Sequence, residues 1–270
     1  MDDSIYKGYK EIVGTTDEIN QYMSKIDFND WFINEYILIR NTDDDSESEM
    51  KFDGEKFVAL KLPPSRYIKA KNALQRCALD ILNNKDITVA AILGGYGSGK
   101  TMLSTLMSLY GVQEKGWQSK ILGVRSPVGE GKSVGYLRGD LLDKTMEFFM
   151  PLVDQLSGGE FELDSLRQRG ILDSNIPFYL KGRSLNSCCI LVDEAEDLTM
   201  KEIRLIGTRL GEDSRIILNG DYKQSTSNAT ISNPLVQMCN KFKGQPKFGC
   251  IYLGEDVRSS TSKMFATLLE

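Results

Sequence analysis

The run Gly94-Gly95-Tyr96-Gly97-Ser98-Gly99-Lys100-Thr101 constrains the fold of this chain more than any other feature. It fits the pattern GxxxxGK[ST], with an apolar run at 87–93 before it and a helical pattern at 101–110 after it. A glycine-rich loop between a buried strand and a helix directs backbone N–H groups and the helix N-terminus toward one point. The pattern therefore predicts an α/β fold with an anion site at the end of a central strand.

The residue types of this loop match the chemistry of a nucleoside triphosphate. The glycines let the backbone approach phosphate oxygens, Lys100 reaches the β- and γ-phosphates, and the Thr101 hydroxyl binds Mg²⁺. We expect ATP and Mg²⁺ here, held by residues 94–101. The competing interpretation is a plain glycine turn.

The rest of the body alternates short apolar runs with helical patterns. The strand candidates are 87–93, 120–124, 188–192, 215–218 and 249–253, and the helix candidates are 66–82, 101–110, 139–155, 200–210, 234–242 and a segment from 261. Such alternation is typical of a parallel sheet with crossover helices on both faces. We expect a five-stranded, mainly parallel sheet.

A second candidate motif, which is acidic, follows the strand candidate at 188–192. Asp193 and Glu194 follow this apolar run, and ligands of open α/β sheets bind at the carboxyl ends of the strands. We expect Asp193 to hold Mg²⁺ through water and Glu194 to orient the attacking water. By itself, an Asp-Glu pair here is often only the start of a helix, and Thr199 with Glu202 does have capping-box spacing.

The strand candidate at 215–218 ends in Asn219-Gly220-Asp221-Tyr222-Lys223-Gln224. Locally this is an ordinary Gly-Asp turn. Its position after the acidic strand matches nucleic-acid motor ATPases, in which this strand lies between the loop strand and the acidic strand. Gln224 is then the candidate sensor of the γ-phosphate, and Asp221 lies near the metal.

Charge and composition exclude several other kinds of chemistry. The chain has no His among its 270 residues, so imidazole acid–base catalysis and His-ligated zinc are excluded. Five Cys, an odd number without CxxC spacing, indicate a reducing compartment. No apolar run is long enough to span a bilayer and no signal-like segment begins the chain, so we expect a cytoplasmic protein without membrane contact.

Acidity is concentrated in the first sixty residues, which hold 15 acidic and 6 basic side chains. The run 43–49 is expected to be a solvated loop between two strands of a β-hairpin, 36–40 and 56–60. We therefore divide the chain into an acidic extension, 1–64, and an ATPase domain, 65–270.

Several motifs in this order resemble the PhoH-like family of P-loop ATPases, in particular the half that follows a PIN nuclease domain in some members. The matching stretches are 34–38, 94–101, 125–128, 135–141, 181–185, 193–195, 208–209, 220–224 and 258–259. The resemblance implies a RecA-like ATPase, often ring-forming and linked to RNA unwinding or processing. The 33 residues before the first match are too few for a PIN domain, so we expect no nuclease activity.

The chain departs from the family pattern at four positions. Glu196 stands where family members usually have glutamine, Arg138 replaces a usual proline, and Tyr96 and Ser98 replace smaller loop residues. The Glu196 change puts the contact made by the family glutamine in question.

Further site residues are expected from the resemblance and from their positions. Gln75 corresponds to the adenine-reading glutamine, although an exposed polar helix residue fits as well. Arg125 follows a strand end and fits an active-site or nucleic-acid role. Arg209 and Arg258 are candidate transition-state arginines acting across a subunit boundary, with surface salt bridges as the alternative.

Loop residues near the same sheet edge are candidates for nucleic-acid contacts. These are Lys132, Arg138, Lys181 and Arg183 for the phosphate backbone and Tyr136 and Phe178 for base stacking, although core packing fits the two aromatic residues better.

The first functional hypothesis is an ATP hydrolase acting as an RNA motor or RNA helicase. One RecA-like body supplies only one lobe, so we expect a homo-oligomer, in the form of a ring such as a hexamer, with single-stranded RNA as partner. A P-loop kinase is the second hypothesis, and a non-catalytic ATP-binding adaptor is the third. Turnover separates the first from the third, and phosphate transfer to an acceptor other than water identifies the second.

Overall fold

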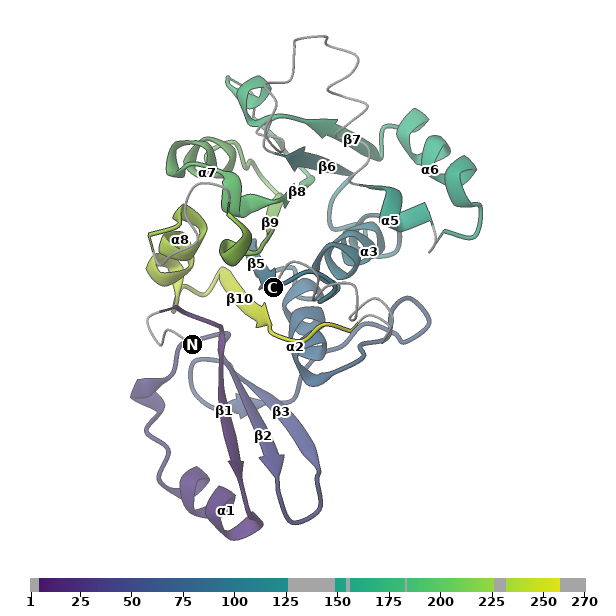
Figure 1. The fold of residues 1–270 in the computed structure, drawn as a ribbon. Coiled ribbons are helices and arrows are strands. Elements are labelled where there is room, and N and C mark those ends of the chain that lie inside the picture. Colours follow the sequence, from purple (N-terminus) through teal and green to yellow (C-terminus); the bar gives the residue numbers. More distant parts are fainter. Residues whose placement is uncertain (1–4, 126–148, 154–155, 183, 226–231, 258–270) are drawn as a thin grey trace.

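The computed structural model describes residues 5–125, 149–153, 156–182, 184–225 and 232–257 (Figure 1). Within these ranges the strands are β1 (Tyr9–Gly14), β2 (Tyr36–Asn41), β3 (Glu47–Phe52), β4 (Phe57–Val58), β5 (Val89–Gly94), β6 (Lys120–Arg125), β7 (Leu172–Asn175), β8 (Cys188–Asp193), β9 (Arg215–Gly220) and β10 (Phe248–Leu253). The α-helices are α1 (Thr16–Ser24), α2 (Ala73–Leu82), α3 (Lys100–Gln113), α5 (Met150–Val153), α6 (Gly159–Gln168), α7 (Met200–Gly207) and α8 (Pro234–Phe242). Short 3₁₀ turns are η1 (Phe28–Asp30), η3 (Pro177–Leu180), η4 (Ala195–Asp197) and η5 (Tyr222–Gln224).

The main sheet is parallel and has the order β10-β5-β9-β8-β6-β7. The α/β class and the position of β9 between β5 and β8 are confirmed. The strand count was wrong, because the sheet has six strands rather than five. The additional strand, β7, reads Leu-Asp-Ser-Asn and pairs with β6 at the sheet edge. An edge strand needs little apolar sequence, so this segment carries no strand pattern.

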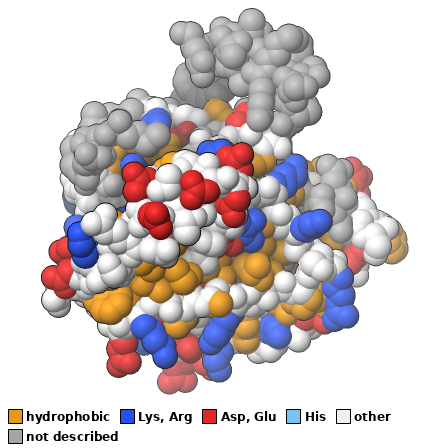
Figure 2. Space-filling view, turned by 90° about the horizontal axis from the view of Figure 1, so that it is seen from below, with side chains coloured by type: hydrophobic (Ala, Val, Ile, Leu, Met, Phe, Trp, Pro, Cys, Tyr) orange, Lys and Arg blue, Asp and Glu red, His pale blue; other side chains and the backbone are white. Residues whose placement is uncertain are grey.

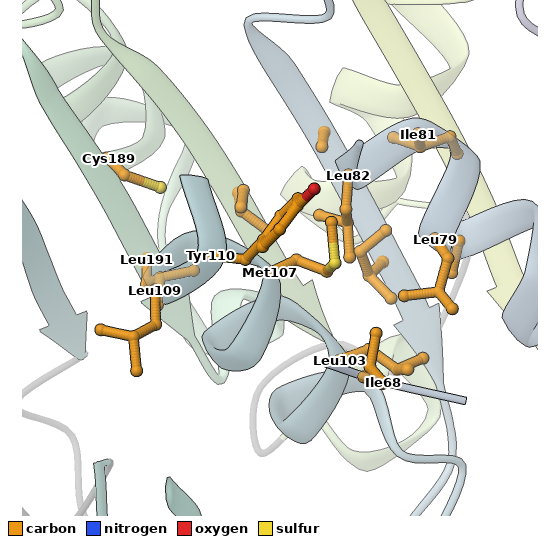
Figure 3. Close-up of a cluster of buried hydrophobic side chains, with 14 of the residues drawn as sticks. Ile68, Leu79, Ile81, Leu82, Leu103, Met107, Leu109, Tyr110, Cys189 and Leu191 are labelled. Atoms are coloured by element: carbon orange, nitrogen blue, oxygen red, sulfur yellow. The ribbon is translucent and has the colours of Figure 1, made fainter. Parts of the chain in front are cut away.

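Alternating side chains of each central strand enter two separate cores. In β8, Cys189 and Leu191 join the core under α2 and α3, whereas Ile190 and Val192 join the core under α7 and α8. Figure 3 shows part of the first core, with Leu79 and Leu82 of α2 on one side, Met107 of α3 between, and Leu191 of β8 on the other side. Because both faces are buried, the strands are continuously apolar, as parallel strands require.

Helix α2 begins later than its apolar pattern predicted. Asn72 is extended and its side chain accepts a hydrogen bond from the Gln75 N–H, so the helix starts at Ala73 rather than near residue 66. Ile68 still packs in the core from the preceding loop. The predicted helices at 139–155 and from 261 fall largely or wholly outside the described residues. In the described part of the chain, no helix is long and apolar enough to cross a membrane.

The N-terminal segment forms a second sheet with the order β1-β2-β3-β4, drawn at the bottom of Figure 1. The predicted hairpin was only partly right. Its return strand is β3, which includes the acidic residues Glu47 and Glu49, and 57–58 adds a third strand. The turn is therefore short, and the pattern gave no sign of β1 and α1. Figure 2 views the molecule from this end and shows acidic side chains gathered on it.

The two sheets are joined by close backbone contacts. Gly8 has φ 82° and its missing Cβ would lie 1.8 Å from the Cys250 carbonyl oxygen, so only glycine fits. The Lys7 carbonyl accepts a hydrogen bond from the Tyr252 N–H at 2.9 Å. The Asn34 amide donates to the Phe248 carbonyl at 2.9 Å. Strand β10 thus connects the N-terminal sheet with the main sheet.

A buried carboxylate also ties the two sheets together. Asp80 of α2 is fully buried, and it accepts hydrogen bonds from the Tyr36 hydroxyl at 2.7 Å and the Lys61 N–H at 2.6 Å. The Lys51 ammonium lies 2.8 Å from the same carboxylate, and its side chain is only 9% exposed. Every group that approaches Asp80 would be left without its acceptor if the carboxylate were removed.

We expect Asp80→Ala to lower the free energy of unfolding by about 3–5 kcal/mol, because Lys51 would remain as an unpaired buried charge. The matched control is Glu47→Ala, which removes a pair with Arg40 whose side chains are 51% and 60% exposed. That loss is expected to be below about 1 kcal/mol. Urea denaturation of both variants measures the difference, and equal losses would contradict this account of the junction.

Candidate nucleotide site

The glycine-rich loop lies where β5 meets α3, at the carboxyl edge of the main sheet. Gly94, Gly97 and Gly99 all have positive φ, at 148°, 74° and 88°. A Cβ on Gly94 would lie 2.4 Å from the Leu253 carbonyl oxygen. Residues with a side chain are therefore excluded at this position, and the backbone takes the course that a phosphate cradle needs.

Lys100 is the first residue of α3, and its ammonium lies against the loop. It donates to the Gly95 carbonyl at 3.1 Å, and the Ser98 hydroxyl donates to the same oxygen at 2.8 Å. Tyr96, which is 69% exposed, has its ring centroid 5.9 Å from the Lys100 ammonium. The cation thus lies against the backbone of the glycine-rich loop.

Gln75 supports the loop from beneath. Its side chain is 1% exposed, donates to the Ser98 carbonyl at 2.9 Å and accepts from the Lys71 N–H at 2.8 Å. The alternative interpretation, that Gln75 is an exposed polar residue of the helix, is therefore wrong. Both ends of the amide are bound within the protein, and an adenine contact of Gln75 stays a prediction. The Val257 N–H also donates to the loop, at the Gly97 carbonyl, 3.1 Å away.

Thr101 and Asp193 meet across the sheet edge. The Thr101 hydroxyl donates to the Asp193 carboxylate at 3.3 Å. Burial raises the pKa of Asp193, partly opposed by the charges of Arg125 and Lys100. A hydroxyl and a carboxylate beside a phosphate cradle form the oxygen donor set that Mg²⁺ takes together with substrate phosphates, so these residues fit the ion.

Glu194 lies next to this pair in an unusual conformation. Its backbone is left-handed, with φ 50° and ψ 44°. Its carboxylate forms a two-point ion pair with Arg125, which donates from Nε at 2.7 Å and from Nη2 to the other oxygen. Arg125 ends β6 and lies opposite Asp193 in the strand register. Arg125 was expected at the site from its position after a strand, but nothing in the local sequence indicated this partner.

The third motif closes the site beside β9. Asp221 is 3% exposed, burial raises its pKa, and it accepts a hydrogen bond from the Gln224 amide at 2.6 Å. A Cβ on Gly95 would lie 3.8 Å from the Asp221 carboxylate. Asp221 therefore faces the glycine-rich loop, and Gln224 is oriented through it.

Glu196 connects the acidic strand end with this third motif. Its side chain packs against Gly220, where a Cβ would lie 2.7 Å from Oε2. Its carbonyl accepts from the Asn233 amide at 3.0 Å and from the Ser225 hydroxyl at 3.2 Å. Burial raises the pKa of Glu196 to about 7, and hydrogen bonds from its own N–H and that of Asp221 oppose the shift. Near neutral pH this carboxyl is therefore only partly ionised, and its buried Oε2 has no hydrogen-bond partner among the described residues.

We expect Glu196→Gln to stabilise the protein in a pH-dependent way. Below the ordinary pKa of 4.5 both the folded and the unfolded state hold the proton, so the variant has no advantage. Between 4.5 and about 7 only the unfolded state releases it, which disfavours folding of the wild type increasingly. The gain should reach up to roughly 3 kcal/mol above this range. Denaturation of both proteins at acidic and alkaline pH measures it, and a gain that is constant with pH would contradict the assignment.

The remaining candidates divide into three groups. Arg209 follows α7, and its carbonyl accepts from the Leu185 N–H, so it lies at the amino edge of the sheet, away from the loop of its own chain. Phe178 is 59% exposed, so the core-packing expectation was wrong, and the Lys181 ammonium lies 4.5 Å from its ring. Outside the described residues lie Lys132, Tyr136, Arg138, Arg183 and Arg258.

Comparisons with known proteins agree with the motif order. Residues 67–270 match the family described as PhoH-like protein. Protein PhoH2 of Bacillus subtilis is 30% identical over 290 residues, which cover 99% of this chain and 65% of that protein. Protein PhoH of Escherichia coli K12 is 28% identical, covering 72% of this chain and 55% of that protein. The chain thus spans only about half to two thirds of the length of these relatives.

Among solved structures, the crystal structure of the Pyrococcus furiosus Hef helicase domain has a TM-score of 0.37 and 15% identity, covering 64% of this chain and 36% of that one. That likeness is too low to bear on function. The family match spans most of the chain and includes the glycine-rich loop, the acidic strand end and the third motif. On this evidence the chain belongs to the PhoH-like protein family.

Proposed function

We propose that this protein hydrolyses ATP with Mg²⁺ and couples the reaction to single-stranded nucleic acid. RNA is the first candidate for that nucleic acid. The observation that carries the proposal is the convergence of Lys100, Thr101, Asp193 and Glu194 at one edge of the sheet, with the Thr101 hydroxyl 3.3 Å from the Asp193 carboxylate. These are the groups that phosphoryl transfer to water requires.

Each residue has a separate task in this mechanism. Lys100 leaves the Gly95 carbonyl and neutralises charge on the β- and γ-phosphates. Thr101 and Asp193 would hold Mg²⁺, which would supply positive charge to the phosphates when bound. Glu194 accepts a hydrogen bond from the attacking water and aligns it, while Gln224 senses the γ-phosphate from Asp221.

We propose oligomerisation because one copy of the ATPase domain supplies only one lobe of the nucleotide site. Transition-state charge in such enzymes is commonly neutralised by an arginine from a neighbouring subunit. Arg209 lies at the opposite edge of the sheet from its own loop, so it is suited only to a site on another copy. Arg258 has the same proposed role, and we propose a homo-oligomeric ring as the active form.

The nucleic-acid partner is proposed from the exposed surface beside β6. Phe178 and Lys181 follow β7, the neighbour of β6, and offer an apolar ring and a cation to solvent. Aromatic stacking and phosphate pairing are the two contacts that sequence-independent single-strand binding uses.

Steady-state ATP turnover with and without oligouridylate, across a range of protein concentrations, tests the proposal. We expect turnover per protomer to rise with RNA and with protein concentration, because neighbouring copies complete the site. Transfer of the labelled γ-phosphate to an acceptor other than water would indicate a kinase. ATP binding without turnover under all conditions would indicate an adaptor.

A further inference from the structure

The ion pair of Glu194 is in conflict with the role that the mechanism gives this residue. Arg125 donates to both carboxylate oxygens, from Nε at 2.7 Å and from Nη2. A carboxylate bound in this two-point manner has its best acceptor positions occupied by the guanidinium. In this state Glu194 cannot align a water molecule, so the conformation is a resting one.

The backbone of Glu194 is consistent with a residue held by its side chain. A left-handed conformation costs a non-glycine residue on the order of 1 kcal/mol. Here φ is 50° and ψ is 44°, immediately before the η4 turn. The ion pair offsets this cost, and its loss would free Glu194 to adopt another backbone conformation.

Arg125 is accessible to a competing anion. Its side chain is 34% exposed and that of Glu194 is 38% exposed, so the pair lies at the surface rather than in the core. The guanidinium fork fits a phosphate as well as it fits a carboxylate. The half-buried pair has a modest net free energy, and a phosphate can accept the same two-point contact from the guanidinium, so it can displace the carboxylate.

The surroundings of Arg125 indicate which anion would reach it. Strand β7 lies directly beside β6, with Val124 opposite Asn175. The chain then continues into η3, which presents the exposed Phe178 ring with the Lys181 ammonium 4.5 Å from it. An aromatic ring and a cation in the segment that follows the strand paired with β6, together with Arg125, match the alternating bases and phosphates of a single strand better than they match a free inorganic ion.

We propose that Arg125 is the residue through which nucleic acid switches on ATP hydrolysis. In the resting protein it sequesters Glu194, and a backbone phosphate of the bound strand takes the guanidinium and releases the carboxylate to the attacking water. Arg125 is thus a positioning residue that restrains the catalytic base. This inference rests on the proposed function, for which it names the coupling device.

The equilibrium test is a double-mutant cycle on oligouridylate binding, which requires no ATP turnover. Because Glu194 competes with phosphate for Arg125, Glu194→Gln should bind labelled oligouridylate about fivefold more tightly than the wild type. In an Arg125→Gln background the same change should have almost no effect. Fluorescence anisotropy at one ionic strength measures the four affinities. A tightening of the same size in both backgrounds would overturn the inference, since it would reflect only general charge.

The kinetic test uses the same arginine. Arg125→Gln should raise ATP turnover in the absence of RNA severalfold, because Glu194 is already free. For the same reason, the ratio of turnover with RNA to turnover without RNA should fall close to one. The matched control is Arg167→Gln on α6, which removes a surface pair with Asp164 and should leave both values unchanged. Basal turnover that falls or stays constant in Arg125→Gln, with RNA stimulation intact, would overturn the inference.

The two proposals fail in distinguishable ways. If the wild type hydrolyses ATP but the cycle shows no coupling between Arg125 and Glu194, the switch is excluded and the proposed ATPase activity stands. If the wild type does not hydrolyse ATP, the proposed hydrolase function is excluded. Absence of oligouridylate binding in all four proteins overturns the switch and the nucleic-acid partner together.

Discussion

Lys100→Ala is expected to reduce ATP turnover by at least about a hundredfold, because it removes the only side-chain cation of the glycine-rich loop. Lys100 begins α3, and its ammonium stands over the loop within 3.1 Å of the Gly95 carbonyl. Within the loop, developing charge on the transferred phosphoryl group would then be stabilised only by backbone N–H groups and the helix N-terminus. Phosphate release measured at saturating ATP, together with an ATP-binding isotherm, determines how much of the loss lies in binding.

The control for this variant is Lys115→Ala. Lys115 follows α3, with its ammonium 5.4 Å from the Tyr110 ring, and is remote from the loop. It should keep wild-type turnover. The fold should be unaffected in both variants, since within the described residues the Lys100 ammonium makes one hydrogen bond, to the Gly95 carbonyl. If Lys100→Ala kept more than a tenth of the turnover, the glycine-rich loop would not be the phosphate site.

Glu194→Gln is expected to separate binding from hydrolysis. Gln keeps the size of the side chain, so the packing around residue 194 should be preserved. The amide lacks the basicity needed to align and deprotonate water, which corresponds to a loss of about 10²–10⁴ in turnover. ATP affinity should stay within about threefold of the wild type, because Glu194 does not contact Lys100 or Thr101 in the described structure.

The comparison variant is Glu202→Gln on α7. Glu202 accepts hydrogen bonds from Thr199 in the capping box, and glutamine serves in the same motif. It should retain both binding and turnover. Loss of ATP binding in Glu194→Gln would contradict the role of this residue as the water-aligning base and would make it part of the nucleotide contact instead.

The central part of the fold follows from local sequence. The apolar strands 188–192 and 215–218 appear within one residue or two of β8 and β9, because strands buried on both faces must be apolar throughout. The parallel order then places Asp193, Asp221 and the glycine-rich loop at one edge. Elements stabilised mainly by tertiary contacts are not visible in this way. β7 reads Leu-Asp-Ser-Asn, and β3 includes acidic residues that were expected in a loop.

The residues of the candidate site were predictable by type, but their partners were not. Nothing in the local pattern around Gln75 shows that its amide supports the Ser98 carbonyl. The pairing of Arg125 with Glu194 depends on the register that sets Arg125 opposite Asp193. The raised pKa of Glu196 results from burial between η4 and β9, a property of packing rather than of sequence. Such contacts require the strand order before they can be derived.

The most direct test of the central claim is the release of inorganic phosphate from ATP by the wild-type chain with Mg²⁺ and oligouridylate, measured beside Glu194→Gln. The wild type should release phosphate to water in repeated turnovers, faster with the RNA than without it, while the variant should bind ATP and release almost none. Equal phosphate release from both proteins, or ATP binding without release by the wild type, would contradict it.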